Sequence, residues 1–318
     1  MVLLPTTALV DWTQLLESAR SSVFLVEFTP VKAESEEMKR LAKAARTKVN
    51  PLLAHLLAQE WLTETGIAAG LVGDQLYILT TAHIVDHLFH AVRCPISATK
   101  LNQLFTIRVV CIHAEQDFWH RQGIGGRVYT PAPASGINCA QDLLMLRVSV
   151  GELAIRTQGF QRVPCTHPHP VLPFSAAPQL GEQCLLFSWP PFRPGTFTVG
   201  LEGQMRSLRA MSGTSVGYDV DLLEAAIGSE LGSSGGPLFN PSQQVKGTLH
   251  GGYDGPVSFF IPTHVILEFI HEHAVNPPPA QEESSDDEEP VYKRRRLQDG
   301  ATTSRGGRKY IGDDDDDD

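Results

Sequence analysis

Glycine and proline divide most of this chain into short apolar runs, and that division limits its possible folds more than any other feature. The 318 residues include 27 glycines and 22 prolines. Runs such as "LYILT" and "CLLFSW" have the length of a strand and end at turn-forming residues, whereas helices average about 11 residues. The sequence therefore predicts a mostly β fold rather than a helical bundle.

The order of these runs predicts four regions. A helix at 9–19 and a strand at 21–30 come first, and helix-forming residues at 32–60 indicate a helical insertion. The proline-rich "PCTHPHPVLP" at 164–173 separates two groups of strands. We expect N-terminal helices and a first strand with a helical insertion at 1–65, a first β-barrel at 66–163, a second β-barrel with a C-terminal helix at 164–275, and a charged disordered tail at 276–318.

Individual strands are expected wherever an apolar run has turn residues on both sides. The segment from 65 to 85 reads as two strands joined by a Gly-Asp turn at 73–74, and 263–274 reads as the C-terminal helix. The remaining predicted strands are 105–114, 141–150, 183–189, 196–208, 216–226, 244–253 and 257–262.

The charge distribution excludes a broad basic surface. Residues 281–318 hold 13 acidic and 7 basic side chains, which leaves 23 acidic and 19 basic ones in residues 1–280. Nucleic acid is therefore not the expected main partner. Within the tail, the basic cluster of Lys293, Arg294, Arg295 and Arg296 has two interpretations, a nuclear localisation signal or solubilising charge.

Cysteine spacing and hydropathy indicate a reduced, soluble, intracellular protein. The five cysteines are odd in number and form no CxxC pair, so we expect buried thiols rather than disulfides or a zinc site. The N-terminus lacks a basic region before its apolar residues, and no segment reaches the roughly 18 apolar residues that span a bilayer. We expect no membrane partner and no small-molecule cofactor.

Three motifs together predict nucleophilic catalysis. They are "TTAHIV" with His83, "QDLLMLRV" with Asp142 and "GSSGGPLF" with Ser234. A serine hydroxyl needs a base, a neutral imidazole is a base at physiological pH, and a carboxylate fixes the imidazole tautomer. Glycines beside the serine allow two backbone N–H groups to converge on an oxyanion.

In this order and setting, the motifs resemble those of the trypsin-like, chymotrypsin-fold serine peptidases over roughly 65–270. The resemblance implies two six-stranded antiparallel β-barrels, with Ser234 as nucleophile, His83 as base and Asp142 as orienting acid. It also implies an oxyanion hole from the N–H groups of Gly232 and Ser234. "VKGTLHGG" resembles the strand that pairs with a bound peptide, which places His250, Gly251 and Gly252 beside the substrate, and Gly228 falls at the floor of the specificity pocket.

Two departures from the secreted members refine this resemblance. Ile84 follows His83, and no cysteine lies between residue 185 and the end. In this the chain resembles the intracellular, disulfide-free branch that includes HtrA-type proteases, although no PDZ-like segment follows residue 275. Ser233 stands where secreted members have an aspartate, so activation by a salt bridge to a new N-terminus is not expected. No acid falls at Gly228, which makes a preference for Lys or Arg doubtful.

Other residues compete for these roles. Asp86 and Asp117 are alternative acids, but neither opens an apolar strand. His83, His87 and His90 have helical spacing that suits zinc, yet Ile84 stands where a metalloprotease of the HExxH type has its glutamate. The sequence thus predicts a serine endopeptidase acting on proteins or peptides without a metal, and as a possible oligomer. The alternative is a catalytically silent barrel that serves as a nuclear protein-binding module.

Overall fold

The computed structural model describes residues 10–31, 62–83, 96–157, 159–175, 178–189, 199–210, 218–252 and 255–275. All of the described residues belong to one compact unit. The predicted helical insertion at 32–60 and the predicted tail at 276–318 lie outside the described residues. Among the described residues, no helix is long and apolar enough to cross a membrane.

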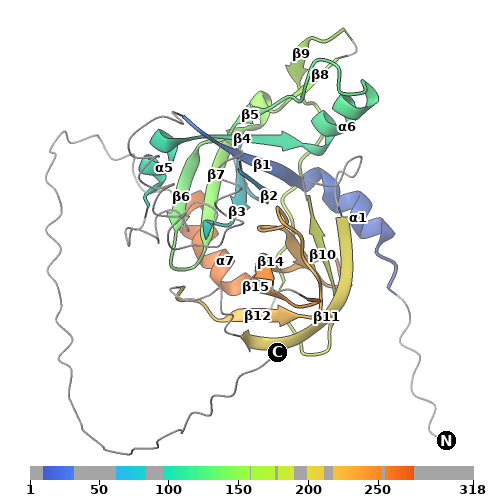
Figure 1. The fold of residues 1–318 in the computed structure, drawn as a ribbon, viewed down its shortest axis with the longest axis vertical. Coiled ribbons are helices and arrows are strands. Elements are labelled where there is room, and N and C mark those ends of the chain that lie inside the picture. The colour runs from blue at the N-terminus through green and yellow to red at the C-terminus, as the bar shows by residue number, and fades with distance from the viewer. Residues whose placement is uncertain are drawn as a thin grey trace, which may run out of the picture. The chain divides into compact units, whose positions relative to one another are not determined.

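The N-terminal half is a curled sheet of seven antiparallel strands (Figure 1). The order β5-β4-β1-β2-β3-β7-β6 places the first two long strands at its centre. Phe24, Phe28 and Ile78 are buried in its core. The strands are β1 (Val23–Pro30), β2 (Leu62–Val72), β3 (Gln75–Thr80), β4 (Phe105–Cys111), β5 (Thr130–Pro131), β6 (Ala134–Asn138) and β7 (Leu143–Ser149).

The C-terminal half is a closed six-stranded barrel with the order β10-β11-β12-β15-β14-β13. Closure leaves no sheet edge unpaired. The two halves are joined through a short ribbon of β8 (Ala154–Arg156) and β9 (Arg162–Pro164) and the segment after it. The barrel strands are β10 (Gln183–Ser188), β11 (Val199–Ala210), β12 (Leu222–Ala225), β13 (Pro237–Phe239), β14 (Val245–Gly252) and β15 (Ser258–Pro262).

Both ends of the described chain reach across to the other half: α1 lies against the C-terminal barrel, and the turn after α7 lies against the N-terminal sheet. Leu16 of the N-terminal helix lies so close to β11 that a side chain at Gly200 would come within 3.1 Å of it, and Figure 1 shows this helix beside β11. At the other end, the ring of His273 covers Gly136 of β6. The helical segments are α1 (Thr13–Ala19), η1 (Arg20–Ser22), α5 (Ala98–Leu104), α6 (Ile112–His120), η2 (Val150–Glu152), α7 (Thr263–Ile270) and the π-helical turn η4 (His271–Val275).

The observed architecture confirms the predicted mostly β, two-barrel fold, with differences in detail. Within the described residues, the first half is a curled seven-stranded sheet rather than a closed six-stranded barrel. Its second strand begins at Leu62, so the sheet takes residues from both sides of the predicted boundary at 65. The strand predicted at 105–114 ends at Cys111, because α6 begins at Ile112 and its first turn takes up the rest of the apolar run.

Candidate active site

Asp142 is fully buried at the start of β7 and is held by backbone donors. Its Oδ1 accepts hydrogen bonds from the N–H groups of Ala82 at 2.9 Å and His83 at 2.6 Å. The residue has a φ of 60°, a left-handed conformation that aspartate tolerates better than most residues. The loop before β7 therefore fixes the carboxylate beneath the chain segment that carries His83.

Two imidazoles converge on the other carboxylate oxygen. His83 Nδ1 lies 2.8 Å from Asp142 Oδ2, and His250 Nδ1 contacts the same oxygen. Burial by itself would raise the pKa of Asp142, but the two histidines outweigh it through charge and hydrogen bonding, so the pKa is lowered well below its usual range. The carboxylate is therefore ionised and can hold the His83 tautomer whose Nε2 is the free base.

A β-bulge directs His250 toward Asp142. Leu249 pairs with Phe260 and Gly251 pairs with Phe259. His250 therefore has no partner residue of its own on β15 and is the extra residue of the bulge. Its side chain is 3% exposed and meets Tyr218 edge-to-face at 4.9 Å between ring centroids. The histidine predicted to lie beside a substrate is thus placed against the buried carboxylate instead of in an open position.

The glycines around Ser234 have a conformation and packing that other residues would not allow. Gly232 and Gly235 have φ values of 86° and 80°. A Cβ at Gly235 would lie 2.1 Å from the Thr65 carbonyl oxygen, and one at Gly236 would lie 2.8 Å from the Ser233 carbonyl oxygen. The motif is therefore a bend of the C-terminal half that packs closely against β2 of the N-terminal half.

Two backbone N–H groups in this bend have no acceptor among the described residues. The N–H groups of Ser233, Gly235 and Gly236 donate to backbone carbonyls at 3.0, 2.8 and 2.9 Å. Within the described part of the chain, those of Gly232 and Ser234 donate to nothing. These are the two groups predicted for an oxyanion hole, and they are free to bind an anionic oxygen.

Thr65 of β2 anchors the bend to the N-terminal sheet. Its N–H donates to the carbonyl of Ser234 and its hydroxyl to that of Gly232, both at 2.9 Å. The same hydroxyl accepts from the N–H of Trp189 at 3.0 Å. Ser234 is half-buried, and its own hydroxyl makes no hydrogen bond with any described residue.

Glu64, the residue before Thr65, is a second buried carboxylate close to His83. Its Oε1 lies 4.0 Å from His83 Nε2, and it accepts hydrogen bonds from the hydroxyls of Thr80 at 2.9 Å and Thr81 at 3.0 Å. Burial raises its pKa to about 7, against the lowering effect of His83 and the hydroxyls. Sequence reasoning missed Glu64 because only the pairing of β2 with β3 places it under His83.

Of the three remaining predicted glycines, two face open space and one is packed against a neighbouring segment. A Cβ at Gly228 or Gly251 would meet no atom within 4 Å, whereas one at Gly252 would lie 2.4 Å from the Ser229 hydroxyl. The segments 228–229 and 251–252 therefore lie side by side, with open space at Gly228 and at Gly251.

The alternative acids and metal ligands are placed elsewhere or lie outside the described residues. Asp117 is in α6, where its carboxylate accepts from Arg121 at 3.2 Å and from the N–H of Arg156 at 3.1 Å. Asp86, His87 and His90 lie outside the described residues. His83, Asp142 and His250 also offer ligand atoms within 4.8 Å of one another, although hydrogen bonds between them already satisfy those atoms.

Comparison with known proteins gives a match in structure and none in sequence. No protein-family model matches the chain, and no curated protein matches it. The structure of the Rv3671c protease from M. tuberculosis in its active form aligns with a TM-score of 0.51 and 16% identity. The alignment covers 85% of this chain and 88% of that protease. The structure of the HtrA-type protease AlgW with a tripeptide aligns with a TM-score of 0.51 and 14% identity. The alignment covers 81% of this chain and 62% of AlgW.

The fold is that of the HtrA-type and other trypsin-like serine proteases. In this trypsin-like fold, His83 and Asp142 come from the N-terminal sheet and the Ser234 bend comes from the barrel. At such low identity the likeness concerns the fold, so the chemistry depends on the side chains of this chain.

Proposed function

We propose that this protein is a trypsin-like serine endopeptidase that hydrolyses peptide bonds through Ser234, His83 and Asp142. The observation that carries the proposal is the combination of two features in one place. An ionised, fully buried Asp142 orients the His83 imidazole, and the bend that carries Ser234 leaves the N–H groups of Gly232 and Ser234 without internal acceptors.

In the proposed reaction, the Ser234 hydroxyl attacks the scissile carbonyl while His83 Nε2 takes its proton. The carbonyl oxygen becomes an oxyanion that the N–H groups of Gly232 and Ser234 stabilise. The imidazolium then gives its proton to the leaving amine, which departs and leaves an acyl-enzyme on Ser234. A water molecule, deprotonated by His83, cleaves the acyl-enzyme and restores the serine.

Asp142 acts in both halves of this cycle without changing its protonation state. Its carboxylate holds Nδ1–H of His83 and stabilises the imidazolium. The contact with His250 on the same oxygen supplies a second donor and keeps the carboxylate in position. His250 is therefore a positioning residue in this mechanism.

The substrate in this proposal is a protein or peptide chain. An extended peptide would pair with the end of β14 at 250–252, and the side chain before the scissile bond would enter the open space beside Gly228 and Gly251.

A fluorophosphonate probe tests the proposal, because it labels only a serine that its own site has activated. Wild-type protein should be labelled, and Ser234→Ala should lose the label completely. Ser233→Ala is the matched control. Ser233 is 1% exposed and its hydroxyl accepts a hydrogen bond from the Ser188 hydroxyl at 2.9 Å, so labelling should persist without it. Equal labelling of Ser234→Ala and wild type would refute the assignment.

The alternative function, a silent barrel that binds proteins in the nucleus, has one observation in its favour. The Ser234 hydroxyl makes no hydrogen bond to His83 in the described structure. If a generic peptide substrate is cleaved no faster by wild type than by His83→Ala, and no probe labels Ser234, the binding module becomes the better description. The basic cluster on which the nuclear location rests lies outside the described residues.

A further inference from the structure

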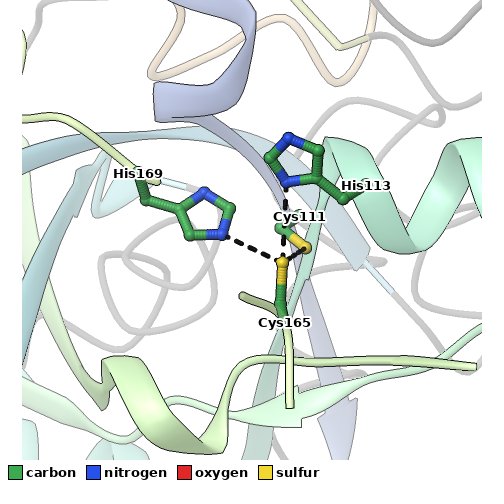
Figure 2. Close-up of side chains that lie close together, drawn as sticks. All are labelled: Cys111, His113, Cys165 and His169. Atoms are coloured by element: carbon green, nitrogen blue, oxygen red, sulfur yellow. Dashed lines mark hydrogen bonds between the residues drawn. The ribbon is translucent and has the colours of Figure 1, made fainter. Parts of the chain in front are cut away.

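A second cluster of reactive side chains lies away from Ser234, where β4, α6 and the segment after β9 meet. It consists of Cys111, His113, Cys165 and His169, which we call the Cys-His cluster. Each residue offers one ligand atom, and all four atoms lie within 4.8 Å of one another. Figure 2 shows the four side chains pointing toward a common centre. We propose that the Cys-His cluster is a structural Zn²⁺ site.

The distances between the ligand atoms match a tetrahedron around zinc. Zn–S bonds of about 2.3 Å and Zn–N bonds of about 2.05 Å imply S–S separations of about 3.8 Å and S–N separations of about 3.6 Å. Cys111 Sγ and Cys165 Sγ are 4.0 Å apart. Cys165 Sγ lies 3.6 Å from His113 Nδ1 and 3.5 Å from His169 Nε2. The two S–N separations already match these values, and the S–S separation is only about 0.2 Å longer than the ideal.

An outer hydrogen bond prepares His169 as a ligand. Its Nδ1 lies 2.6 Å from the carbonyl oxygen of Ser21, which can only accept, so Nδ1 carries the proton. The lone pair of Nε2 then points at the cluster. Such a bond from the distal ring nitrogen to a carbonyl is the usual companion of a metal-binding histidine.

Burial and charge also suit zinc. Both cysteines and His169 are buried, at 2%, 5% and 8% exposure. Two thiolates and two neutral imidazoles balance the charge of a divalent cation, so the filled site is neutral in an apolar surrounding. His113 is additionally stacked on His167, with 4.2 Å between ring centroids, which fixes its ring from the outer side.

The site would tie the connector between the halves to the N-terminal sheet. Cys111 ends β4 and His113 lies in the first turn of α6, whereas Cys165 and His169 belong to the connector at 164–173. The connector already makes backbone hydrogen bonds to Leu153 at 2.6 Å and to Ala68 at 3.1 Å. Zinc would add a cross-link between these two bonds, which start at Cys165 and at Leu172 of the connector.

The spacing explains why the sequence did not suggest this site. The ligands come as Cys-x-His at 111–113 and Cys-x₃-His at 165–169, and neither pair has the CxxC spacing that motivates a zinc prediction. The expectation of buried reduced thiols without a metal treated each cysteine singly. The structure brings two of them to one centre with two histidines.

The test is metal analysis of the full chain expressed in zinc-containing medium and purified without chelator. We expect about one zinc per chain by elemental analysis, lost in Cys165→Ser and in His169→Ala. Cys184→Ser is the matched control, because Cys184 is equally buried in the barrel and should retain the metal. His250→Ala is the second control and reports on the other group of possible ligands.

Cobalt gives a readout that does not depend on whether the variants fold. Co²⁺ added to the metal-stripped wild-type protein should produce thiolate-to-cobalt charge transfer and the intense visible bands of a tetrahedral site. The proposal is overturned if wild type binds neither metal, if a Cys111–Cys165 disulfide is found in the native protein, or if the zinc survives Cys165→Ser but not His250→Ala.

Discussion

Glu64 shows how a single buried residue can make the stability of the fold depend on pH. Its carboxyl is 1% exposed, and burial raises its pKa from the usual 4.5 to about 7. A raised carboxyl pKa means that the folded protein holds this proton more tightly than the unfolded chain does. The stabilisation is therefore complete below about pH 4.5 and is lost as the pH rises to about 7.

Glu64→Gln should remove this dependence. Between pH 4.5 and 7, wild type should lose on the order of 3 kcal/mol of unfolding free energy through Glu64, and the variant should lose none of it. Urea unfolding of both proteins at several pH values measures the difference. His83→Ala should instead raise the pKa of Glu64 further, since His83 lowers it, and so should increase the loss of stability with rising pH. Parallel pH profiles for wild type and Glu64→Gln would contradict the assignment.

At the scale of elements, the bend at 231–236 depends on how closely it approaches the N-terminal sheet. Gly235 combines a positive φ with a position where a Cβ would overlap the Thr65 carbonyl oxygen. Gly73, in the turn between β2 and β3, also has a positive φ of 61°, but a Cβ there would meet nothing within 4 Å. Substituting Gly73 therefore introduces backbone strain alone, whereas substituting Gly235 introduces backbone strain and steric overlap together.

Gly235→Ala should therefore destabilise the fold by more than about 2 kcal/mol, whereas Gly73→Ala should cost about 1 kcal/mol. Gly235→Ala should also lose fluorophosphonate labelling, because the bend must move away from Thr65. Thermal unfolding and labelling of both variants check this. Equal destabilisation by the two substitutions would mean that the close packing at Gly235 contributes nothing.

Local patterns place the motif residues at the ends of strands, and long-range pairing brings further polar side chains close to them. His83 follows an apolar strand and Asp142 precedes one, so both were found from neighbouring residues. Glu64 and His250 acquire their positions through strand pairing and through a bulge in β14, which no local window reveals. Strands as short as β5 and β13 carry too few residues for any periodicity.

Across the whole molecule, Thr65 links the two halves at the candidate site. Its hydroxyl bonds to Gly232 in the bend and to Trp189 at the end of β10. Thr63 lies two residues earlier on the same face of β2, is also buried, and makes no side-chain hydrogen bond with any described residue. The two threonines differ chiefly in this contact between the halves.

Thr65→Val should cost about 1–3 kcal/mol, because it leaves a buried carbonyl and a buried N–H without partners. It should also slow labelling of Ser234, since the Gly232 carbonyl loses its anchor. Thr63→Val should change stability by less than about 0.5 kcal/mol and leave labelling intact. Chemical denaturation together with labelling rates distinguishes them, and identical behaviour of both variants would show that the link is dispensable.

The packing of the C-terminal turn at 271–275 against the first half has a consequence for synthesis on the ribosome. One hydrophobic cluster contains Trp12 and Phe187 together with Ile67, Phe269 and Ala274. Ala274 is also close to Gly70 in the first half, where a Cβ would lie 3.5 Å from it. Domains usually fold in the order in which they are translated. Here the first half receives its last core residues only when residue 274 emerges. Its hydrophobic core therefore stays incomplete until nearly the whole compact unit has been synthesised.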